Sequence, residues 1–362
     1  MRSWVEVSLG RIRANFSAIK SVVGDAVEVM PVVKADAYRH GAVAVSHALE
    51  AAGARWLAVS NVEEGVALRQ AGTQSRILIM ADFLEDEREA LALHNLTPVI
   101  HSLEDLAAVR VPYHLKIDSG MNRLGTRAAP DEIARMVAAT AAPLEGLMTH
   151  FASSGNYESK QTDEQLAHFE SVLEGLRRAG ITCRYVHSSS TIPVAYGRRQ
   201  AWGNMVRPGH AIYGYVSPAR GGPGKPSVRV KPALTWKVTI LEVKDVPAGS
   251  LIGYGGIHCA ARPMRIAVLA AGYADGIPHR LGNRGHVIAN GKLAPVVGSV
   301  SMDLTTIDIT DCPQLKAGDA VTILGSEGAV SIDAQQMAKW AGTISYAVLC
   351  GIHARVKRVY VD

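Results

Sequence analysis

Apolar and polar residues alternate in two different patterns along this chain of 362 residues. Up to about residue 216, short apolar runs alternate with longer stretches in which apolar residues recur every three or four positions. Residues 159–180 show the second pattern, because apolar side chains keep helical spacing from Leu166 to Leu176 and Gly180 ends it. The apolar runs predict buried strands at residues 27–34, 56–60, 76–80, 97–100, 113–118, 144–150, 183–187 and 204–209.

This alternation predicts an α/β fold for the first part of the chain. Eight strand–helix units within about 200 residues match a TIM-like (β/α)8 barrel, which we place at residues 10–225. The alternative is an open, doubly wound sheet. No GxGxxG motif follows the first strand, and this disfavours the open sheet.

The rhythm changes after residues 217–227, SPARGGPGKPS, which are rich in Gly, Pro and Ser and predict a linker or an exposed loop. Residues 226–362 contain short β-like runs separated by turn residues, so we expect a C-terminal, mostly β domain there. The opening SWVEVSL alternates apolar and polar residues. Residues 1–9 are therefore a candidate extra strand of that domain.

Composition narrows the choice of partners and compartment. The formal charge is +5, but the basic residues are spread out, which favours small anionic ligands over nucleic acid. The four cysteines form no CxxC pair, as expected for reduced thiols in a cytoplasm. Glu6 falls where a secretory signal needs its apolar core, and no apolar run approaches the roughly 20 residues of a membrane span. We therefore expect a cytoplasmic protein with no membrane partner.

Polar residues fall where the predicted strands end, which is where a barrel of this type carries its active site. Lys34 ends the first strand, Lys116 lies near the end of the fifth, His150 ends the sixth and Arg207 lies in the eighth. The seventh strand runs into the hydroxyl-rich HSSST of residues 187–191. These positions would converge on one rim of the barrel.

The chemistry of these groups indicates a particular cofactor. A lysine amine forms Schiff bases readily when burial or a nearby cation lowers its pKa. The serine run and the amides of Gly209 and His210 suit a phosphate group. A lysine that binds aldehydes beside a phosphate site indicates pyridoxal 5′-phosphate, PLP. The remaining histidines lack the spacing of metal ligands, so no metal is predicted.

Seven motifs, in order, give a more specific prediction. The sequence resembles the alanine racemases, the barrel-type PLP enzymes, over nearly its whole length. The resemblance implies a PLP-binding barrel followed by a β domain, and a cytoplasmic homodimer whose subunits share each active site. It also implies interconversion of L-alanine and D-alanine, with D-alanine supplied to peptidoglycan synthesis. The matching motifs are VVKADAYRHG, LKIDSGMNRLG, MTHFA, VRPGHAIYG, AGYADG, VGSVSMD and ISYAVL.

The resemblance also assigns roles to residues. It implies that Lys34 anchors PLP and is one catalytic base, and that Tyr273 from the other subunit is the opposing base. Arg123 and Met302 would contact the substrate, and Lys116 would be open to carbamylation. The family commonly has Asn-Ser where this chain has Ser190-Thr191, so the hydroxyl is kept. The residues implied to bind the cofactor are Lys34, Tyr38, His150, Thr191, Arg207, Gly209, His210 and Tyr346.

Racemisation removes the Cα proton from one face of the substrate and returns a proton to the other. Two bases on opposite faces achieve this without moving the substrate. Because tyrosine ordinarily titrates near pH 10, we expect cations such as Arg207 or His150 to favour a tyrosinate. A guanidinium also keeps its proton, so Arg207 would leave the pyridine nitrogen unprotonated and limit side reactions.

Other interpretations remain open from sequence alone. A PLP decarboxylase on the same architecture would place a carboxylate at the pyridine nitrogen, and a PLP carrier would need no second domain. Taken residue by residue, Lys34 could instead be a strand-end lysine that reaches solvent. Tyr273 and Met302 would be packing residues and His150 a hydrogen-bonded core histidine. Lys116 would form a plain ion pair with Asp118.

Overall fold

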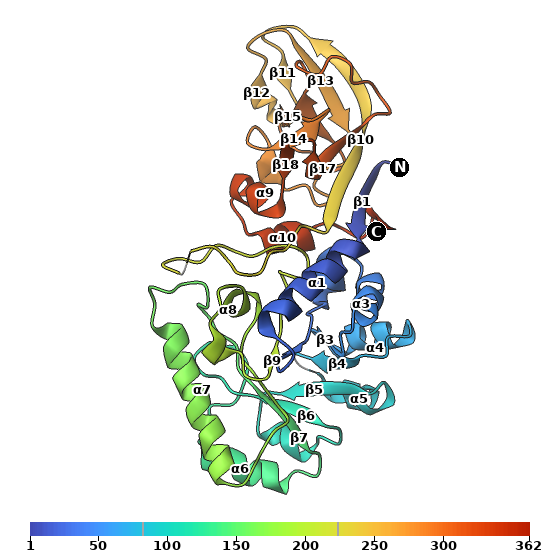
Figure 1. The fold of residues 1–362 in the computed structure, drawn as a ribbon. Helices are drawn as coiled ribbons and strands as arrows, with labels where there is room; N and C mark the ends of the chain where they lie inside the picture. The colour runs from blue at the N-terminus through green and yellow to red at the C-terminus, as the bar shows by residue number, and fades with distance from the viewer. Residues whose placement is uncertain (82, 223) are drawn as a thin grey trace. The chain divides into compact units, whose positions relative to one another are not determined.

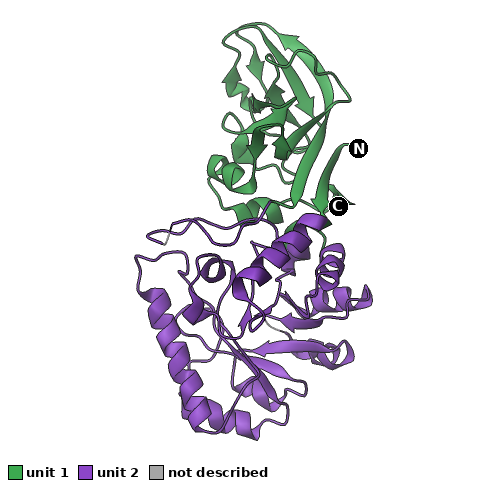
Figure 2. Cartoon of the chain, in the orientation of Figure 1, with its two compact units in different colours: residues 1–9, 38–41, 232–362 green, residues 10–37, 42–231 purple. Residues whose placement is uncertain are grey.

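The computed structural model describes residues 1–81, 83–222 and 224–362; Pro223, in the predicted linker, lies outside the described residues. The chain forms two compact units (Figure 2). The barrel unit contains residues 10–37 and 42–231, and the β unit contains residues 1–9, 38–41 and 232–362. The division therefore falls at residue 231 rather than 225. The short segment 38–41 belongs to the β unit although it lies early in the chain.

Parallel strands form the interior of the barrel unit (Figure 1). Six of them pair in chain order, and β2 pairs with β9. A bridge between Val32 and Ala58 links the β2 segment to β3, and the Arg207 N–H donates to the carbonyl of Ser189 at 2.9 Å beside β8 and β9. These contacts close the ring. The strands are β2 (Glu28–Val29), β3 (Trp56–Val59), β4 (Arg76–Ile79), β5 (Leu96–Ile100), β6 (Tyr113–Lys116), β7 (Leu144–Met148), β8 (Tyr185–His187) and β9 (Met205–Val206).

Amphipathic helices connect these strands. In α1, buried Ile12, Phe16 and Ile19 recur at intervals of three and four residues, as expected for one apolar helix face. The α-helices of this unit are α1 (Leu9–Val23), α3 (Ala42–Ala51), α4 (Val62–Gln70), α5 (Arg88–Leu93), α6 (Pro130–Ala139), α7 (Gln161–Arg178) and α8 (Thr191–Ala195), with α2 (Lys34–Arg39) treated below and the 3-10 turns η1 (Glu85–Glu87), η2 (Glu104–Ala107) and η3 (Arg199–Ala201).

The first barrel strand is shorter than the sequence predicts. The predicted strand covers residues 27–34, whereas β2 ends at Val29. Pro31 has no N–H to donate to a ladder. Strand-like hydrogen bonds still continue, since the Val32 N–H donates to Pro208 and the Val33 N–H to Ala58. The prediction that Lys34 ends a strand is wrong, because Lys34 is the first residue of α2.

A nine-stranded sheet dominates the β unit, with β1 beside β10 in Figure 1. The alternation in the opening segment matches its burial, because Val5 and Val7 are fully buried while β1 pairs with β10 and with β19. The elements are β1 (Ser3–Ser8), β10 (Leu234–Val246), β11 (Leu251–Ile252), β12 (His258–Cys259), β13 (Met264–Leu269), β14 (His286–Ala289), β15 (Lys292–Pro295), β16 (Thr305–Asp308), β17 (Ala320–Glu327), β18 (Val330–Ile332), β19 (Lys357–Val361), α9 (Ala334–Ala341), α10 (Ser345–Cys350), η4 (Tyr254–Gly256) and η5 (His279–Leu281).

All four cysteines are free thiols. Across the described residues, no helix is both long enough and apolar enough to cross a membrane.

Candidate active site

Arg207 follows β9, and only 2% of the residue is exposed. Its Nη1 donates to Nδ1 of His187 at 2.7 Å and to the carbonyl oxygen of the same residue at 2.8 Å. Its Nη2 donates to the carbonyl oxygens of Thr149 at 2.7 Å and Ser188 at 3.1 Å, with Nδ1 of His150 at 3.3 Å. Both terminal nitrogens are therefore engaged. Within the described residues, no acceptor bonds the remaining donor, Nε–H.

These bonds fix the tautomers of the neighbouring histidines. Arginine only donates, so His150 and His187 must each accept through an unprotonated Nδ1. His187 Nε2 in turn lies 2.8 Å from Nδ1 of His114, so the chain of hydrogen bonds continues into the barrel. Burial, reinforced by Arg207, lowers the pKa of His150 to about 3 and that of His187 well below its usual value. Both rings therefore favour the neutral form, which leaves Arg207 as the group expected to supply positive charge.

Arg207 itself remains positively charged between the two neutral histidines. Burial lowers its pKa to about 9. That value is still well above neutral pH, so the charged guanidinium predominates. The neutral histidines and backbone carbonyls around Arg207 therefore orient its charge without cancelling it.

Lys116, at the end of β6, is buried with 5% of the residue exposed. Burial and repulsion from Arg123 and Arg207 lower its pKa to about 8, while Asp118 acts in the opposite direction. Oδ1 of Asp118 accepts the backbone N–H groups of residues 120–122 at 2.9–3.1 Å. In the part of the chain that the structure describes, no ion pair joins Lys116 to Asp118. Asp118 instead shapes the loop that carries Arg123.

Lys34 begins α2, and this short helix is left-handed. The φ angles from Ala35 to Arg39 lie between +52° and +65°, where each L-residue costs roughly 1–2 kcal/mol. The carboxylate of Glu64 accepts the Ala35 N–H at 2.6 Å, and Oδ1 of Asp36 accepts the Ala42 N–H at 2.7 Å. Strain of this kind persists where surrounding bonds over-determine the backbone, which is common at functional sites.

The charge of Lys34 contributes to lowering the pKa of both Lys116 and His150. Lys34 therefore faces the same cluster as these two residues. The structure thus brings Lys34, Lys116, His150 and Arg207 together, as the sequence predicts, on the rim of the barrel unit.

Two predicted phosphate-binding residues also meet. Oγ1 of Thr191 accepts the N–H groups of Gly209 and Ala211, each at 3.2 Å. Because the hydroxyl accepts both amides, its own O–H is left to donate to a phosphate oxygen. Ala211 was not predicted. His210 is buried, and its ring stacks on Tyr215 with ring centres 5.1 Å apart.

The other predicted site residues belong to the β unit. Tyr273, in the loop after β13, is 41% exposed, and Met302 is 55% exposed. The two lie on loops in direct backbone contact, since the Tyr273 N–H donates to Ser301 and the Ala274 N–H to Met302. Tyr38 and Tyr346 form a second pair, with ring centres 6.1 Å apart. Burial, then the neighbouring Tyr346, raises the pKa of the Tyr38 hydroxyl.

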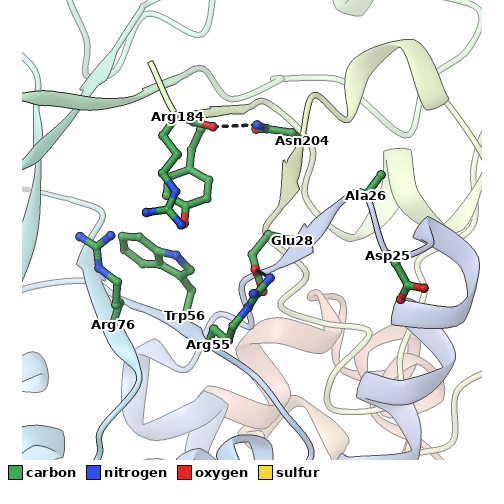
Figure 3. Close-up of a pocket in the computed structure, with 9 residues that line it drawn as sticks. Asp25, Ala26, Glu28, Arg55, Trp56, Arg76, Arg184 and Asn204 are labelled. Carbon is green, nitrogen blue, oxygen red and sulfur yellow. Dashed lines mark hydrogen bonds and ion pairs between the residues drawn. The ribbon is translucent and has the colours of Figure 1, made fainter. Parts of the chain in front are cut away.

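A separate pocket of about 400 Å³ lies at the amino-terminal ends of the barrel strands (Figure 3). Two of its arginines form ion pairs: Arg55 pairs with Glu28, and Arg76 pairs with Glu145 while lying 4.0 Å above the ring of Trp56. The third, Arg184, lies 5.2 Å from the ring of Tyr185. This end of a barrel usually serves stability, so we assign the pocket no catalytic role. It is lined by Asp25, Ala26, Glu28, Arg55, Trp56, Arg76, Arg184, Tyr185 and Asn204.

Comparison with known proteins decides the family. Residues 7–218 match the family model described as "Alanine racemase, N-terminal domain". Residues 233–360 match the model described as "Alanine racemase, C-terminal domain". The chain belongs to the alanine racemase family. The predicted resemblance and the predicted barrel-plus-β fold are both confirmed.

Individual relatives agree with this assignment. An alanine racemase from Halothermothrix orenii is 38% identical over 369 residues, covering 99% of this chain and 96% of the relative. A Bacillus anthracis alanine racemase, solved with bound L-Ala-P, has a TM-score of 0.90 and is 31% identical, covering 100% of this chain and 95% of that one. A Bartonella henselae alanine racemase with covalently bound pyridoxal phosphate has a TM-score of 0.87 and is 26% identical, with 100% coverage of both chains.

The residues of this chain fit PLP, the cofactor of the family. Arg207 has one donor left over after its other hydrogen bonds, which suits an aromatic ring nitrogen as acceptor. The Thr191 hydroxyl, held by the amides of Gly209 and Ala211, can donate to a phosphate. Lys34 supplies an amine for an aldehyde.

Sequence reasoning missed the buried histidines that support Arg207. His114 and His187 are both fully buried in β6 and β8. The sequence does indicate them weakly, because each is a polar residue inside a largely apolar run, YHLK or YVH. A lone histidine on a strand is usually explained by local packing, so the pattern alone does not identify a site residue.

Proposed function

We propose that this chain racemises alanine with PLP, using Lys34 and Tyr273 as two bases on opposite faces of the substrate. The match to the family along both domains supports the reaction. The division of roles among the residues is our proposal, and the following paragraphs give its support.

The observation that carries the proposal is the setting of Arg207. Its two terminal nitrogens are held by two histidines and three carbonyl oxygens, which leaves Nε–H for the cofactor ring. When bound, PLP supplies an aldehyde for covalent attachment and a ring that accepts electrons from the substrate Cα–H bond. The guanidinium keeps its own proton at neutral pH, since its pKa is about 9. A decarboxylase would instead need a carboxylate at this position.

Lys34 and Tyr273 would carry the proton chemistry. The Nζ of Lys34 would take the Cα proton on one face, and the Oη of Tyr273 would deliver a proton on the other. In the reverse direction the two groups exchange tasks. The charge of Lys34 contributes to lowering the pKa of Lys116, so the proposed base lies close to that residue.

The Thr191 hydroxyl, which accepts the amides of Gly209 and Ala211, would donate its own O–H to the phosphate. Burial keeps the Tyr38 hydroxyl protonated, so Tyr38 is proposed as a phosphate donor together with its neighbour Tyr346. Arg123 would bind the substrate carboxylate.

Lys116 would be carbamylated. With a pKa of about 8, roughly a tenth of its amine is neutral at pH 7, and only the neutral amine attacks CO2. A new N–C bond forms, one proton is released, and the product is an anion. That anion would attract Arg123 and Arg207, which now repel the ammonium. A carbamate signal in ¹³C NMR after incubation with ¹³C-bicarbonate, absent from Lys116→Met, would support this step; its absence from the wild type would exclude it.

The proposed function is tested by chiral chromatography of alanine incubated with the PLP-loaded protein. The wild type should convert either enantiomer into an equal mixture. Lys34→Ala should abolish both the conversion and the visible absorbance of the covalently held cofactor. Tyr273→Phe should keep that absorbance but slow conversion about 100-fold or more, as expected when a general base is lost.

Two results would contradict the proposal. Loss of CO2 from the amino acid, without racemisation, would indicate a decarboxylase. Near-normal turnover by Tyr273→Phe would exclude this tyrosine as the second base.

A further inference from the structure

Arg355, in the turn between α10 and β19, binds two carboxylates of the β unit. Its Nε donates to Oδ1 of Asp275 at 2.7 Å and its Nη2 to Oδ2 of the same carboxylate at 2.9 Å. Nη2 also donates to Oδ1 of Asp303 at 2.6 Å. Asp275 is buried, with 4% of the residue exposed. One guanidinium therefore holds a buried and an exposed carboxylate in fixed positions.

The two carboxylates lie on different loops. Asp275 is two residues beyond Tyr273, and its Oδ2 also accepts the Gly272 N–H at 2.9 Å. Asp303 directly follows Met302. Arg355 thus joins the loop of the proposed second base to the loop of a proposed substrate contact.

The same turn is bonded to the Tyr273 loop through the backbone. The His353 N–H donates to the carbonyl oxygen of Asp275 at 3.0 Å. A Cβ on Gly276 would lie 2.2 Å from the carbonyl oxygen of Gly351. This turn follows α10, the helix that carries Tyr346. Three segments with proposed site residues therefore meet at Arg355.

The Tyr273 loop and the Met302 loop are also in direct backbone contact. The Tyr273 N–H donates to Ser301 at 3.0 Å, and a Cβ on Gly272 would lie 2.2 Å from the same carbonyl oxygen. Tyr273 is 41% exposed in this chain, and its ring packs edge-on to that of His279, with ring centres 6.1 Å apart. The backbone bonds of its loop therefore contribute to fixing its position.

We propose that Arg355 is a positioning residue for Tyr273, acting through Asp275 and Asp303. The inference rests on the proposed role of Tyr273 as the second base. Without Arg355, the buried carboxylate of Asp275 would keep only the Gly272 amide and would draw in water or shift. A displacement of the loop by about 1 Å can cost a base around 100-fold in rate.

A double-mutant cycle on the PLP-loaded enzyme tests this inference. Arg355→Ala should lower kcat by about 10- to 100-fold with a smaller change in KM, because a misplaced base acts mainly on the chemical step. In the Tyr273→Phe background, the same substitution should cost about twofold or less, since its target is already gone. Arg355→Lys should recover part of the loss. Arg265→Ala, which removes an exposed pair with Asp245 in the same unit, is the matched control and should leave kcat unchanged.

A second readout separates positioning from general damage. Exchange of the alanine Cα proton with deuterated water, followed by ¹H NMR, should slow unequally for the two enantiomers in Arg355→Ala, because one of the two bases is displaced. If this variant fails to fold by circular dichroism, Asp303→Asn takes its place. It removes the negative charge from one arm of the contact while leaving Asp275 paired, and it should show a smaller loss with the same non-additivity.

Distinct results overturn distinct claims. Equal losses from Arg355→Ala, or from Asp303→Asn where it takes its place, in the wild-type and Tyr273→Phe backgrounds would show that Arg355 does not act through Tyr273. A wild-type kcat for Arg355→Ala alone would also show that Arg355 does not position Tyr273. Normal turnover by Tyr273→Phe alone would instead refute the proposed function.

Discussion

His114 and His187 illustrate how single residues are fitted to the barrel interior. Side chains of one interior layer come from alternate strands, here β6 and β8. The intervening β7 contributes Gly146, where a Cβ would lie 2.6 Å from the His114 ring. The missing side chain leaves room for the histidine pair, which in turn orients Arg207.

The neutral state of His114 makes stability depend on pH. Burial, then Arg76 and Arg207, lowers its pKa from 6.5 to about 3, while the unfolded chain has the ordinary value. Below pH 6.5 His114 therefore binds a proton in the unfolded state but not in the folded state. The free energy of unfolding consequently decreases as the pH falls toward 3. The slope from one such group is about 1 kcal/mol per pH unit.

We predict that His114→Gln reduces this slope in the PLP-free protein. Gln keeps an acceptor for His187 but does not titrate. Urea unfolding between about pH 7 and pH 5 should show a flatter decline in the free energy of unfolding for the variant. His168→Gln, at an exposed position of α7, is the control and should match the wild type. Equal slopes in all three proteins would mean that His114 is protonated in the folded state.

At the scale of elements, the left-handed α2 is the feature that sequence reasoning could not supply. A pattern of side chains predicts where a helix lies, but the hand of a short turn depends on bonds from elsewhere in the fold. Here Glu64, from α4, accepts the Ala35 N–H, and Asp36, within α2, accepts the Ala42 N–H that follows it. The short β2 has the same kind of cause, since Pro31 interrupts the donors of the run.

Other elements followed from the sequence because local and global preferences agree. The spacing in 159–180 predicts α7, and its buried residues Leu166, Phe169 and Leu176 are those on the predicted apolar face. The rim residues Lys34, His150 and Arg207 were predictable for a related reason, as strand ends in a barrel converge. The amide of Ala211 was not predicted, since every residue type except proline supplies the same donor.

At the scale of the whole molecule, the proposed two bases lie in different compact units. We propose that a homodimer supplies Lys34 from one subunit and Tyr273 from the other to each site. Large exposed side chains of the β unit support an interface there. They include Leu251, Tyr254, Ile257, Met302 and Ile344.

Mixing two inactive variants tests this arrangement. Lys34→Ala and Tyr273→Phe, dissociated together and reassociated, should regain about a quarter of wild-type racemase activity, because half the dimers are mixed and each has one intact site. Each variant treated alone is the control and should stay inactive. No recovery from a mixture that sedimentation shows to be dimeric would place both bases in a single chain.

The hand of α2 has a consequence for the chemistry of the chain itself. A D-amino acid is the mirror image of its L-form, so it favours the positive φ that Ala35 and Ala37 adopt. Chemical synthesis of the segment with D-alanine at these two positions would relieve the backbone where the natural residues strain it. At these two backbone positions, a D-alanine residue would therefore suit the fold better than the L-alanine residue that the chain contains. D-alanine is also the form that the proposed reaction produces from L-alanine.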